Sequence, residues 1–327
     1  MKIAILAVTK KGYKTAEKIK QSLPDSVIID SPAGVRPALE HIWPRYDGII
    51  CIMAAGIVVR CISGLCHSKY SDPCVVVTDE HGAFCVSLLS GHIGGGNKLA
   101  LKVASLCKGT AVITTASDLS GHTAVDLWSI ENCLSIVNPE RLAATSARLL
   151  NSGELNVYQD RTYGISFPSD FKLCKHSSQA DVIISMTPDK ESSLLHLVPR
   201  INYIGFGCRR GTNIEEFEQA VADIQEIKGV PLASIAGIAS IDLKKDEPGL
   251  CEIAVLKKWP IRFFSKEALN SIQSPSISSK VFEKVGTWGV CEPAAMLAAS
   301  NRGKQGHLII GKMTWERITA AIAQKVH

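Results

Sequence analysis

The chain has 327 residues, of which 46% are hydrophobic and 20% charged, and its formal net charge is +5. This composition excludes a disordered chain, and the length suffices for two or three domains with cores of their own. The apolar start, residues 1–8, is too short for a signal peptide, and no apolar run approaches the ~18 residues of a membrane span. We therefore expect a cytoplasmic protein without a membrane partner.

The eleven cysteines form no Cys-x-x-Cys pair and lie mostly in apolar runs, as Cys51 does in residues 49–52. This pattern predicts reduced, buried thiols and no metal site. The modest net charge comes without a run of Lys and Arg or interleaved aromatic residues, so the sequence does not indicate nucleic-acid binding.

Strand and helix patterns alternate through the first ~130 residues, as in a parallel sheet covered by helices. The expected strands are residues 3–8, 26–29, 48–53, 74–77, 84–89 and 111–114, and the expected helices are residues 15–23 and 97–107. Because ligands of such sheets bind at the carboxyl ends of the strands, we expect the polar segments that follow four of these strands to converge on one site. These segments are residues 54–56, 78–80, 90–92 and 115–118.

The densest polar cluster is LSGHIGGGN at residues 89–97, between an expected strand and an expected helix. Its glycines let the backbone turn, and a helix N-terminus attracts carboxylates or phosphates through its N–H groups and dipole. His92 stands in this turn, where its charge can change near neutral pH. A Walker loop is excluded because Asn97 precedes Lys98, and a dinucleotide loop because Ile93 replaces the second glycine. The cluster predicts a site for an acidic ligand, with a glycine-rich turn that binds nothing as the alternative.

The remaining expected elements are a helix at residues 140–150, strands at residues 182–186 and 201–206, a helix at residues 213–227 and, at residues 308–311 and 318–323, two segments that fit strand or helix equally. We therefore predict an α/β fold in three parts. These are a parallel-sheet amino-terminal α/β domain at residues 1–136, a small middle segment at residues 137–199 and a second, carboxy-terminal α/β domain at residues 200–327.

A basic turn, GCRRGT at residues 207–212, precedes the helix of the last domain. Arg209 and Arg210 lie between glycines, and Thr212 or Asn213 would cap the helix that follows. Guanidinium groups bind carboxylates and phosphates in a two-pronged fork. The turn therefore predicts a second site for an acidic group, with an exposed turn carrying two solvated charges as the alternative.

Several of these motifs together resemble one family. In the first half they are AGIVVR (residues 55–60), VVVTDEHG (75–82), LSGHIGGGN (89–97) and TTASD (114–118). In the second half they are GFGCRRGT (205–212), ASIDLKKDEPGL (239–250), IRFFS (261–265), VGT (285–287) and EPAA (292–295). This set resembles the cobalt-precorrin 5A hydrolases, the CbiG family of anaerobic cobalamin biosynthesis, over nearly the whole chain. Gly96, where the family often has alanine, and TWGVC at residues 287–291 depart from the family pattern.

The resemblance implies hydrolytic opening of a δ-lactone on a cobalt-containing tetrapyrrole, followed by carbon–carbon cleavage that gives cobalt-precorrin 5B and acetaldehyde. Cobalt would arrive inside the substrate, so we expect no metal site and no cofactor of the protein's own. The many carboxylates of such a substrate suit both predicted acidic-ligand sites. The sequence leaves the oligomeric state open, and a homodimer is one of the alternatives. It also leaves open whether other enzymes of the pathway hand their product to this protein.

The candidate catalytic residues are His92, Asp118, Ser90, Asp79 and Glu80. We favour His92 and Asp118 for proton transfer because they follow neighbouring expected strands. Ser90 lacks the Gly-x-Ser-x-Gly turn of a serine hydrolase, so direct attack by water is favoured, with the backbone N–H groups of residues 94–96 as donors to the oxyanion or to a carboxylate. The candidate substrate-binding residues are Arg60, Gly91, Gly94, Gly95, Gly96, Asn97, Thr115, Ser117, Cys208, Arg209, Arg210 and Thr212.

Two other classes of protein stay open at this point. One is a tetrapyrrole-binding or carrier protein of the same pathway without catalysis. The other is a nucleotide-dependent transferase that would use the loop at residues 91–98.

Overall fold

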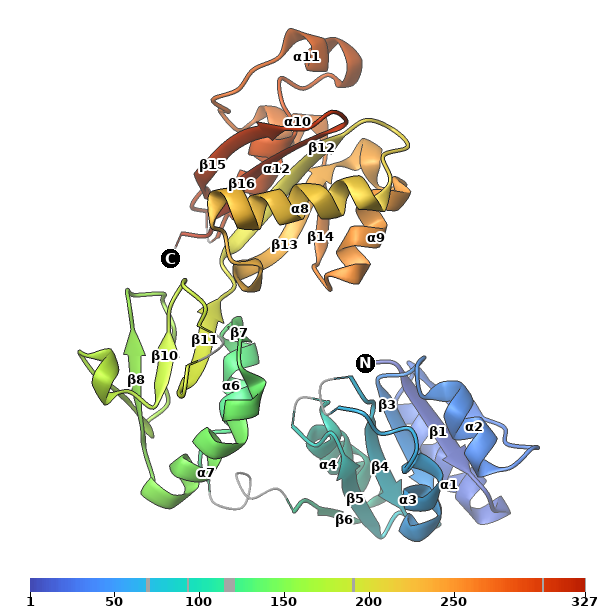
Figure 1. Cartoon of the computed structure of the whole chain (residues 1–327). Helices are drawn as coiled ribbons and strands as arrows, with labels where there is room; N and C mark the ends of the chain where they lie inside the picture. Colours follow the sequence, from blue (N-terminus) through green and yellow to red (C-terminus); the bar gives the residue numbers. More distant parts are fainter. Residues whose placement is uncertain (69–70, 93, 115–120, 190–191, 302, 327) are drawn as a thin grey trace. The chain divides into compact units, whose positions relative to one another are not determined.

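The computed structural model describes residues 1–68, 71–92, 94–114, 121–189, 192–301 and 303–326. It divides into two compact units, Met1–Trp128 and Ser129–His327, and both are α/β, as expected (Figure 1). In the described part of the chain, no helix is both long and apolar enough to span a membrane.

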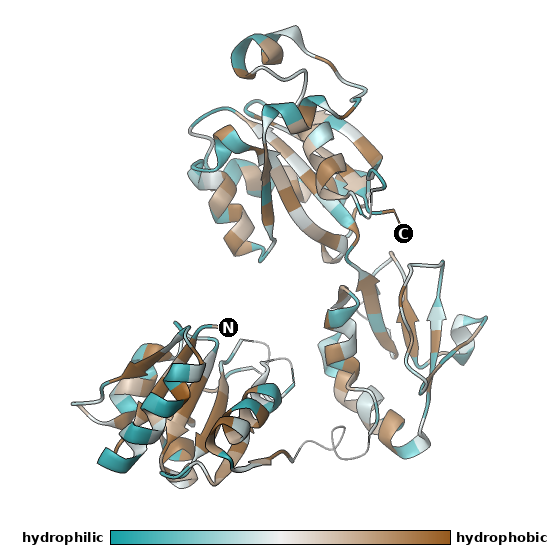
Figure 2. Ribbon diagram, turned by 180° about the vertical axis from the view of Figure 1, so that it is seen from behind, coloured by the Kyte–Doolittle hydropathy of each residue, from teal (hydrophilic) through white to brown (hydrophobic). Residues whose placement is uncertain are grey.

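The first unit contains a sheet in the order β2-β1-β3-β4-β5-β6. Its strands are β1 (Ile3–Ala7), β2 (Ser26–Ile29), β3 (Gly48–Ile52), β4 (Cys74–Thr78), β5 (Phe84–Leu89) and β6 (Thr110–Val112). The strands β1, β3 and β4 are buried along their whole length, which explains their continuous apolar sequence. Hydrophobic residues accordingly follow the strands in Figure 2.

Helices cover both faces of this sheet. They are α1 (Lys10–Ser22), α2 (Val35–Ile42), α3 (Ala55–Ile62) and α4 (Gly96–Cys107). Residues of α1 and α4 pack in one core cluster, and residues of α2 and α3 pack in another. The helix α6 (Val125–Glu131) begins at the end of this unit.

One strand of the sheet runs against the others, and it changes the position of the predicted site. The strand β5 pairs antiparallel with β4 and parallel with β6, whereas β2, β1, β3 and β4 are mutually parallel. Residues 90–92 therefore lie at the edge of the sheet opposite to residues 54–56 and 78–80. The expectation that these segments converge is wrong, because the short connection at residues 79–83 makes a hairpin instead of a crossover.

The second unit contains two sheets. The first has the order β7-β11-β10-β8-β9, formed by β7 (Leu134–Ile136), β8 (Leu155–Gln159), β9 (Phe171–Leu173), β10 (Val182–Ile184) and β11 (Leu195–Pro199), and it is accompanied by α7 (Leu142–Ser152). Since β7 pairs antiparallel with β11, residues 134–136 belong to this sheet and not to that of the first unit, where the sequence analysis had placed them.

The second of these sheets has the order β14-β13-β12-β16-β15. Its strands are β12 (Asn202–Cys208), β13 (Ile235–Ile241), β14 (Ile261–Phe264), β15 (His307–Thr314) and β16 (Ile318–Gln324). The last two are strands, which settles the ambiguity at the end of the chain. The strands β12 to β14 are parallel, whereas β16 pairs antiparallel with both β12 and β15.

Helices also cover both faces of the last sheet. They are α8 (Ile214–Lys228), α9 (Pro248–Leu256), α10 (Lys266–Asn270) and α12 (Cys291–Ala298), and the helix α11 (Ser279–Val285) lies between α10 and α12 in the chain. The helices α8 and α9 pack in one cluster with Ile204 and Phe206 of β12, whereas α10 and α12 pack in another cluster with Tyr203 of the same strand. Alternate side chains of β12 thus face opposite layers.

Candidate functional sites

The loop before α4 uses its own backbone donors. Gly95 is the N-cap of α4, with φ of 81° and no side-chain cap. The N–H groups of Gly95 and Gly96 donate to the carbonyl oxygens of His92 (3.0 Å) and Ser90 (3.1 Å). The N–H group of Asn97 donates to the carbonyl oxygen of Gly91 (2.9 Å). In this conformation Gly95 and Gly96 therefore do not serve as oxyanion donors, contrary to the expectation.

Internal packing also accounts for the glycines of this loop. A Cβ atom on Gly91 would lie 2.6 Å from the Oδ1 atom of Asn97, and one on Gly96 would lie 2.9 Å from the carbonyl oxygen of Leu89. A Cβ atom on Gly94 would lie 2.5 Å from that of Ser90. Larger residues would force the loop apart, so these glycines are explained without a ligand.

His92 and Ser90 lie in this loop at the edge described above. The Nδ1 atom of His92 lies 3.8 Å from the Oδ1 atom of Asp126, and both side chains are largely buried, at 12% and 14% exposure. The hydroxyl of Ser90 donates to the carbonyl oxygen of Asp72 (3.3 Å). The sequence does not predict Asp126 as the acidic neighbour of His92, because nothing in it links α6 to this loop. The predicted residues Thr115, Ser117 and Asp118 lie outside the described residues.

Asp79 and Glu80 stabilise turns at the opposite edge of the sheet. The carboxylate of Asp79 accepts the N–H groups of His81 and Phe84, each at 2.8 Å. Burial opposes its ionisation, but these hydrogen bonds hold the pKa of Asp79 below its ordinary value. Glu80 accepts the hydroxyl of Thr9 at 2.8 Å, and Thr9 caps the N-terminus of α1. Both carboxylates thus have structural partners.

These two carboxylates also line a cavity of about 500 Å³ at the ends of β1, β3 and β4. Arg60, another predicted binding residue, lies on α3 and is exposed. It is not part of the described wall of this cavity.

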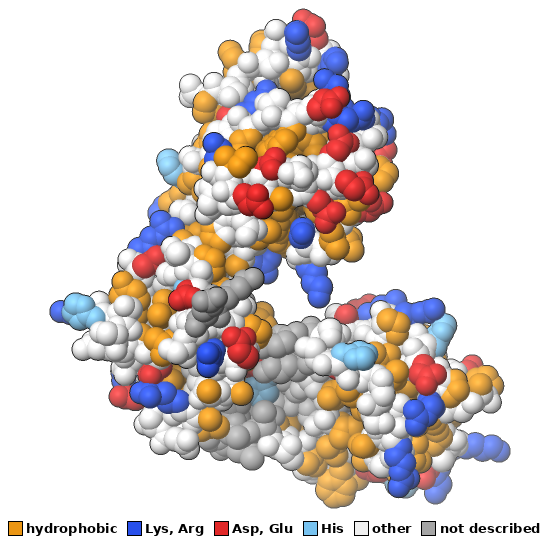
Figure 3. All heavy atoms as spheres, in the orientation of Figure 1, with side chains coloured by type: hydrophobic (Ala, Val, Ile, Leu, Met, Phe, Trp, Pro, Cys, Tyr) orange, Lys and Arg blue, Asp and Glu red, His pale blue; other side chains and the backbone are white. Residues whose placement is uncertain are grey.

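The second unit contains a cavity of about 510 Å³ beside the end of β12. Of the described residues that line it, the basic ones are Arg209, Arg210, Lys244, Lys284, Lys312 and Arg317, and the acidic ones are Glu292 and Glu316. Trp288 and Trp315 supply large apolar surfaces to the same wall. On the face shown in Figure 3, by contrast, acidic and basic side chains are intermixed over this unit. The described cavity wall thus carries six basic side chains and two acidic ones.

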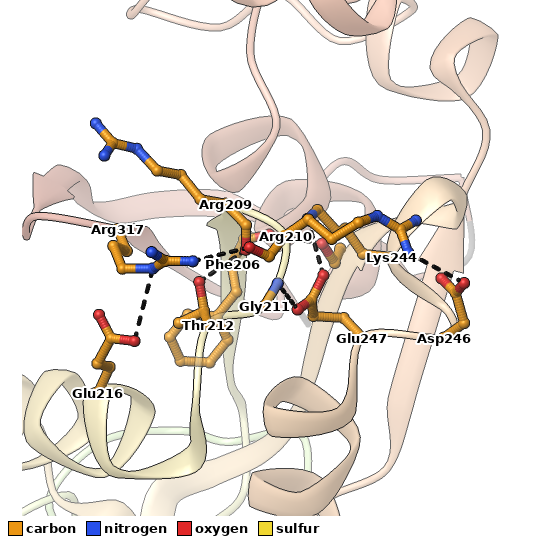
Figure 4. Close-up of polar contacts among 11 residues, drawn as sticks. Phe206, Arg209, Arg210, Gly211, Thr212, Glu216, Lys244, Asp246, Glu247 and Arg317 are labelled. Atoms are coloured by element: carbon orange, nitrogen blue, oxygen red, sulfur yellow. Dashed lines mark hydrogen bonds and ion pairs between the residues drawn. The ribbon is translucent and has the colours of Figure 1, made fainter.

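A buried ion pair shapes the basic turn at residues 207–212. Glu247, which is 1% exposed, accepts the N–H group of Gly211 at 2.6 Å and the ammonium group of Lys244 at 3.0 Å (Figure 4). Burial disfavours its charge, but these two partners hold the pKa of Glu247 below its ordinary value. The hydroxyl of Thr212 donates to the carbonyl oxygen of Arg209 at 2.7 Å. Thr212 thus supports the turn from within.

The two arginines of the turn leave it in different directions (Figure 4). Arg210 lies 3.4 Å from Asp246, and both side chains are exposed. The guanidinium of Arg317 donates to the carbonyl oxygen of Arg210 at 2.8 Å. Arg209 and Arg210 both line the cavity, and the prediction that they bind an acidic group stays a prediction.

The helix after this turn begins as predicted. Asn213 caps α8, its side chain accepts the N–H group of Glu216, and the Glu216 side chain accepts the N–H group of Asn213 in return. This capping box fixes the start of the helix, so the basic turn is held at one end by α8 and at the other by β12.

Two thiols in the cavity wall are protonated at neutral pH. Burial raises the pKa of Cys208 to about 11, against the attraction of Lys244. Burial likewise raises the pKa of Cys291 to about 11. Neither thiol is a ready nucleophile or metal ligand, because both reactions need the thiolate. Among the described residues, no cluster of three or more His, Cys, Asp or Glu side chains is arranged to hold a metal ion.

The fold and the sites define an α/β protein of two units with a basic, partly aromatic ligand cavity. Residues 37–118 match the family model of the cobalamin synthesis G N-terminal region, and residues 202–323 match that of the cobalamin synthesis G C-terminus. The chain is 32% identical to cobalt-precorrin-5A hydrolase of Priestia megaterium, over 90% of this chain and 88% of that protein. It is 30% identical to cobalt-precorrin-5A hydrolase of Salmonella typhimurium, over 92% of each. The chain belongs to this family of cobalamin-pathway hydrolases.

Two further similarities concern the whole chain and a part of it. A cobalamin biosynthesis protein G homolog from Sulfolobus solfataricus, a solved structure, is 24% identical with a TM-score of 0.42, over 99% of this chain and 97% of that one. Protein CobE of a Sinorhizobium species is 32% identical over 37% of this chain and 77% of that protein.

Proposed function

We propose that this chain opens the δ-lactone of cobalt-precorrin 5A and then cleaves a carbon–carbon bond, giving cobalt-precorrin 5B and acetaldehyde. Membership of the family supports the reaction class. The observation that carries the assignment of substrate is the basic cavity of the second unit, because a tetrapyrrole with acetate and propionate groups presents carboxylates around an apolar ring. Lys and Arg suit the carboxylates, and Trp288 and Trp315 suit the ring.

The reaction consumes one water molecule. Water adds to the lactone carbonyl, the bond to the ring oxygen breaks, and a carboxylate and an alcohol result. A base then takes the proton of the alcohol, the neighbouring carbon–carbon bond breaks, and its electron pair passes into the electron-poor macrocycle. The two carbons leave as acetaldehyde. Cobalt is part of the substrate in this scheme, and the protein supplies no metal of its own.

We assign the proton transfers to His92, because its imidazole is largely buried and lies next to the Asp126 carboxylate, an arrangement that orients a general acid–base group. Asp118 stays a candidate partner, because it follows in sequence β6, a strand parallel to β5. Ser90 stays an alternative nucleophile for lactone opening, and its positive φ of 52° marks a constrained backbone.

Labelled water tests this scheme on the full chain. Anaerobic incubation with cobalt-precorrin 5A in ¹⁸O-water should release acetaldehyde and place the label in the new carboxylate. A covalent acyl adduct on Ser90, detected by mass spectrometry, would show that a serine opens the lactone. If the lactone is consumed but no acetaldehyde appears, the protein catalyses only the opening of the lactone and not the carbon–carbon cleavage.

A binding or carrier role without catalysis is the second candidate. Protein CobE matches 37% of this chain over 77% of its own length, so a part of this chain also occurs largely by itself. Tight binding of the substrate without any acetaldehyde release would favour this role.

A further inference from the structure

Glu292 is a buried carboxylate in the wall of the basic cavity with a complete set of donors. It lies in the first turn of α12 and is 2% exposed. Its Oε2 atom accepts the hydroxyl of Ser274 and the N–H group of Ser276 (2.9 Å). Its Oε1 atom accepts the hydroxyl of Ser276 (3.0 Å) and the N–H group of Lys312 (2.9 Å). Burial disfavours the charge, but these hydrogen bonds lower the pKa of Glu292, so the side chain is ionised at neutral pH.

These donors come from two separate parts of the cavity wall. Ser274 and Ser276 belong to residues 271–290, which we name the α11 segment, and Lys312 belongs to β15. The α11 segment also contributes Lys284 and Trp288 to the wall. Glu292 therefore joins one side of the cavity to another, and it holds the backbone from which the Lys312 side chain reaches the ligand space.

The α11 segment has little core of its own. None of the seven residues of α11, all of which the structure describes, is buried, and α11 stands apart from the sheet in Figure 1. Phe282 and Trp288 stack on each other at 4.3 Å between ring centroids, yet they remain 41% and 46% exposed. Val285 supplies an apolar contact to the core cluster of α12. A segment with so few buried contacts can open at low cost in free energy.

We infer that Glu292 is a positioning residue that clasps the α11 segment to β15, and that this segment is a lid over the basic cavity. The identity of the lid's ligand as a carboxylated tetrapyrrole rests on the proposed function. The role of Glu292 in holding the α11 segment to β15 does not depend on the proposed function. Closing the lid brings the exposed indole of Trp288 and the ammonium group of Lys284 to the ligand, one suited to the face of a macrocycle and the other to its carboxylates.

The substitution Glu292→Gln tests the clasp with almost no change of shape. Each carboxylate oxygen faces one backbone N–H group, and a backbone N–H group cannot turn round to accept. The amide NH₂ group of the glutamine therefore meets a backbone donor in either orientation, which leaves buried donors unsatisfied. We expect amide hydrogen exchange in residues 274–289 to accelerate on the order of tenfold or more, while exchange in β12 and β13 stays at the wild-type rate.

The matched control is Glu283→Gln, which makes the same chemical change at an exposed position of α11 outside the cavity wall. This variant should exchange like the wild type. Should Glu292→Gln fail to fold, the double variant Ser274→Ala/Ser276→Ala removes two donors from the lid side, and it should accelerate exchange in the same residues by a smaller factor. Wild-type exchange in the folded Glu292 variant or in the double variant, or equal acceleration in the Glu283 variant, would overturn the clasp.

Uroporphyrin, a tetrapyrrole with many carboxylates, is the probe for the lid. Its addition to the wild-type chain should slow exchange in residues 274–289, and its affinity should fall at least several-fold in Glu292→Gln but not in Glu283→Gln. If uroporphyrin does not slow amide hydrogen exchange in residues 274–289, the lid is overturned. The same holds if uroporphyrin does not bind. Hydrogen exchange and uroporphyrin affinity are both measured without turnover. The lid can therefore be confirmed in a chain that releases no acetaldehyde, and it can be contradicted in an active hydrolase.

Discussion

A Cβ atom on Gly205 would lie 1.9 Å from the carbonyl oxygen of Cys291. The helix α12 therefore packs directly against the backbone of β12, with no side chain between them. This close approach brings Cys291 and Glu292 to the cavity wall beside the basic turn at residues 207–212. The missing side chain of Gly205 thus determines how closely α12 approaches β12, and with it the position of Cys291 and Glu292 in the cavity wall.

The substitution Gly205→Ala should destabilise the second unit by about 3 kcal/mol, because the new methyl group meets backbone atoms that cannot move aside singly. Chemical denaturation followed by tryptophan fluorescence measures this change. Gly56→Ala is the control, since a Cβ atom there meets no atom within 4 Å, and a change of less than about 1 kcal/mol is expected. A Gly205 variant as stable as the wild type would mean that α12 does not pack this closely.

Binding of uroporphyrin should weaken as ionic strength rises, because carboxylates and cavity cations attract each other less in salt. Arg209→Ala should cost ~1.5–3 kcal/mol of binding free energy, the range for a charged hydrogen bond, measured by fluorescence titration. Lys228→Ala, an exposed change at the end of α8, should bind like the wild type. Salt-independent binding, or equal loss in both variants, would argue against the basic cavity as the binding site.

Glu247 should stabilise the protein at neutral pH and lose this effect in acid. Its pKa is lower in the folded chain than the ordinary value of 4.5, so its contribution is complete above that value and disappears as pH falls through the folded-state pKa. Glu247→Gln should therefore lower the free energy of unfolding by about 2 kcal/mol at neutral pH, and by progressively less in acid. Denaturation curves of Glu247→Gln and of the exposed control Glu218→Gln measure the difference. A loss that does not shrink in acid would mean that charge is not its cause.

The thiols of Cys208 and Cys291 should resist alkylation. With a pKa of about 11 for each, roughly a thousandth of either thiol is ionised at pH ~8. Peptide mass spectrometry after brief treatment with iodoacetamide should show both unlabelled while the exposed Cys133 is modified. Labelling of Cys208 as fast as Cys133 would show that its thiol is activated.

Apolar runs and turn residues predict most of the individual helices and strands, but they do not predict the direction of every strand in the sheet of the first unit. The strand β5 has the predicted bounds, residues 84–89, but it runs antiparallel to β4 and not parallel to it, as the alternation of strands and helices predicts. The signal was present, because residues 79–83 are too few for a crossover between parallel strands. Asp79 even accepts the N–H group at the start of β5, as a hairpin turn residue often does.

Contacts between distant residues limited the prediction of the sites. Asn213 as a helix cap follows from local residue types, and the sequence suggested it. The pairing of Glu247 with the N–H group of Gly211, and the four donors around Glu292, depend on how separate elements pack. The sequence predicts an anion site at residues 89–97 because a helix N-terminus offers N–H groups, but those of Gly95, Gly96 and Asn97 donate to carbonyl oxygens within the loop.

Acetaldehyde released from cobalt-precorrin 5A in a single turnover tests the hydrolase function most directly. We expect the wild-type chain to release one equivalent, His92→Ala to do so ~10²- to 10⁴-fold more slowly for want of an acid–base group, and Ser90→Ala to remain close to the wild type. Circular dichroism confirms that each variant is folded. A wild-type chain that binds the substrate and releases no acetaldehyde would contradict the hydrolase assignment, and full activity in His92→Ala would place the proton transfers elsewhere.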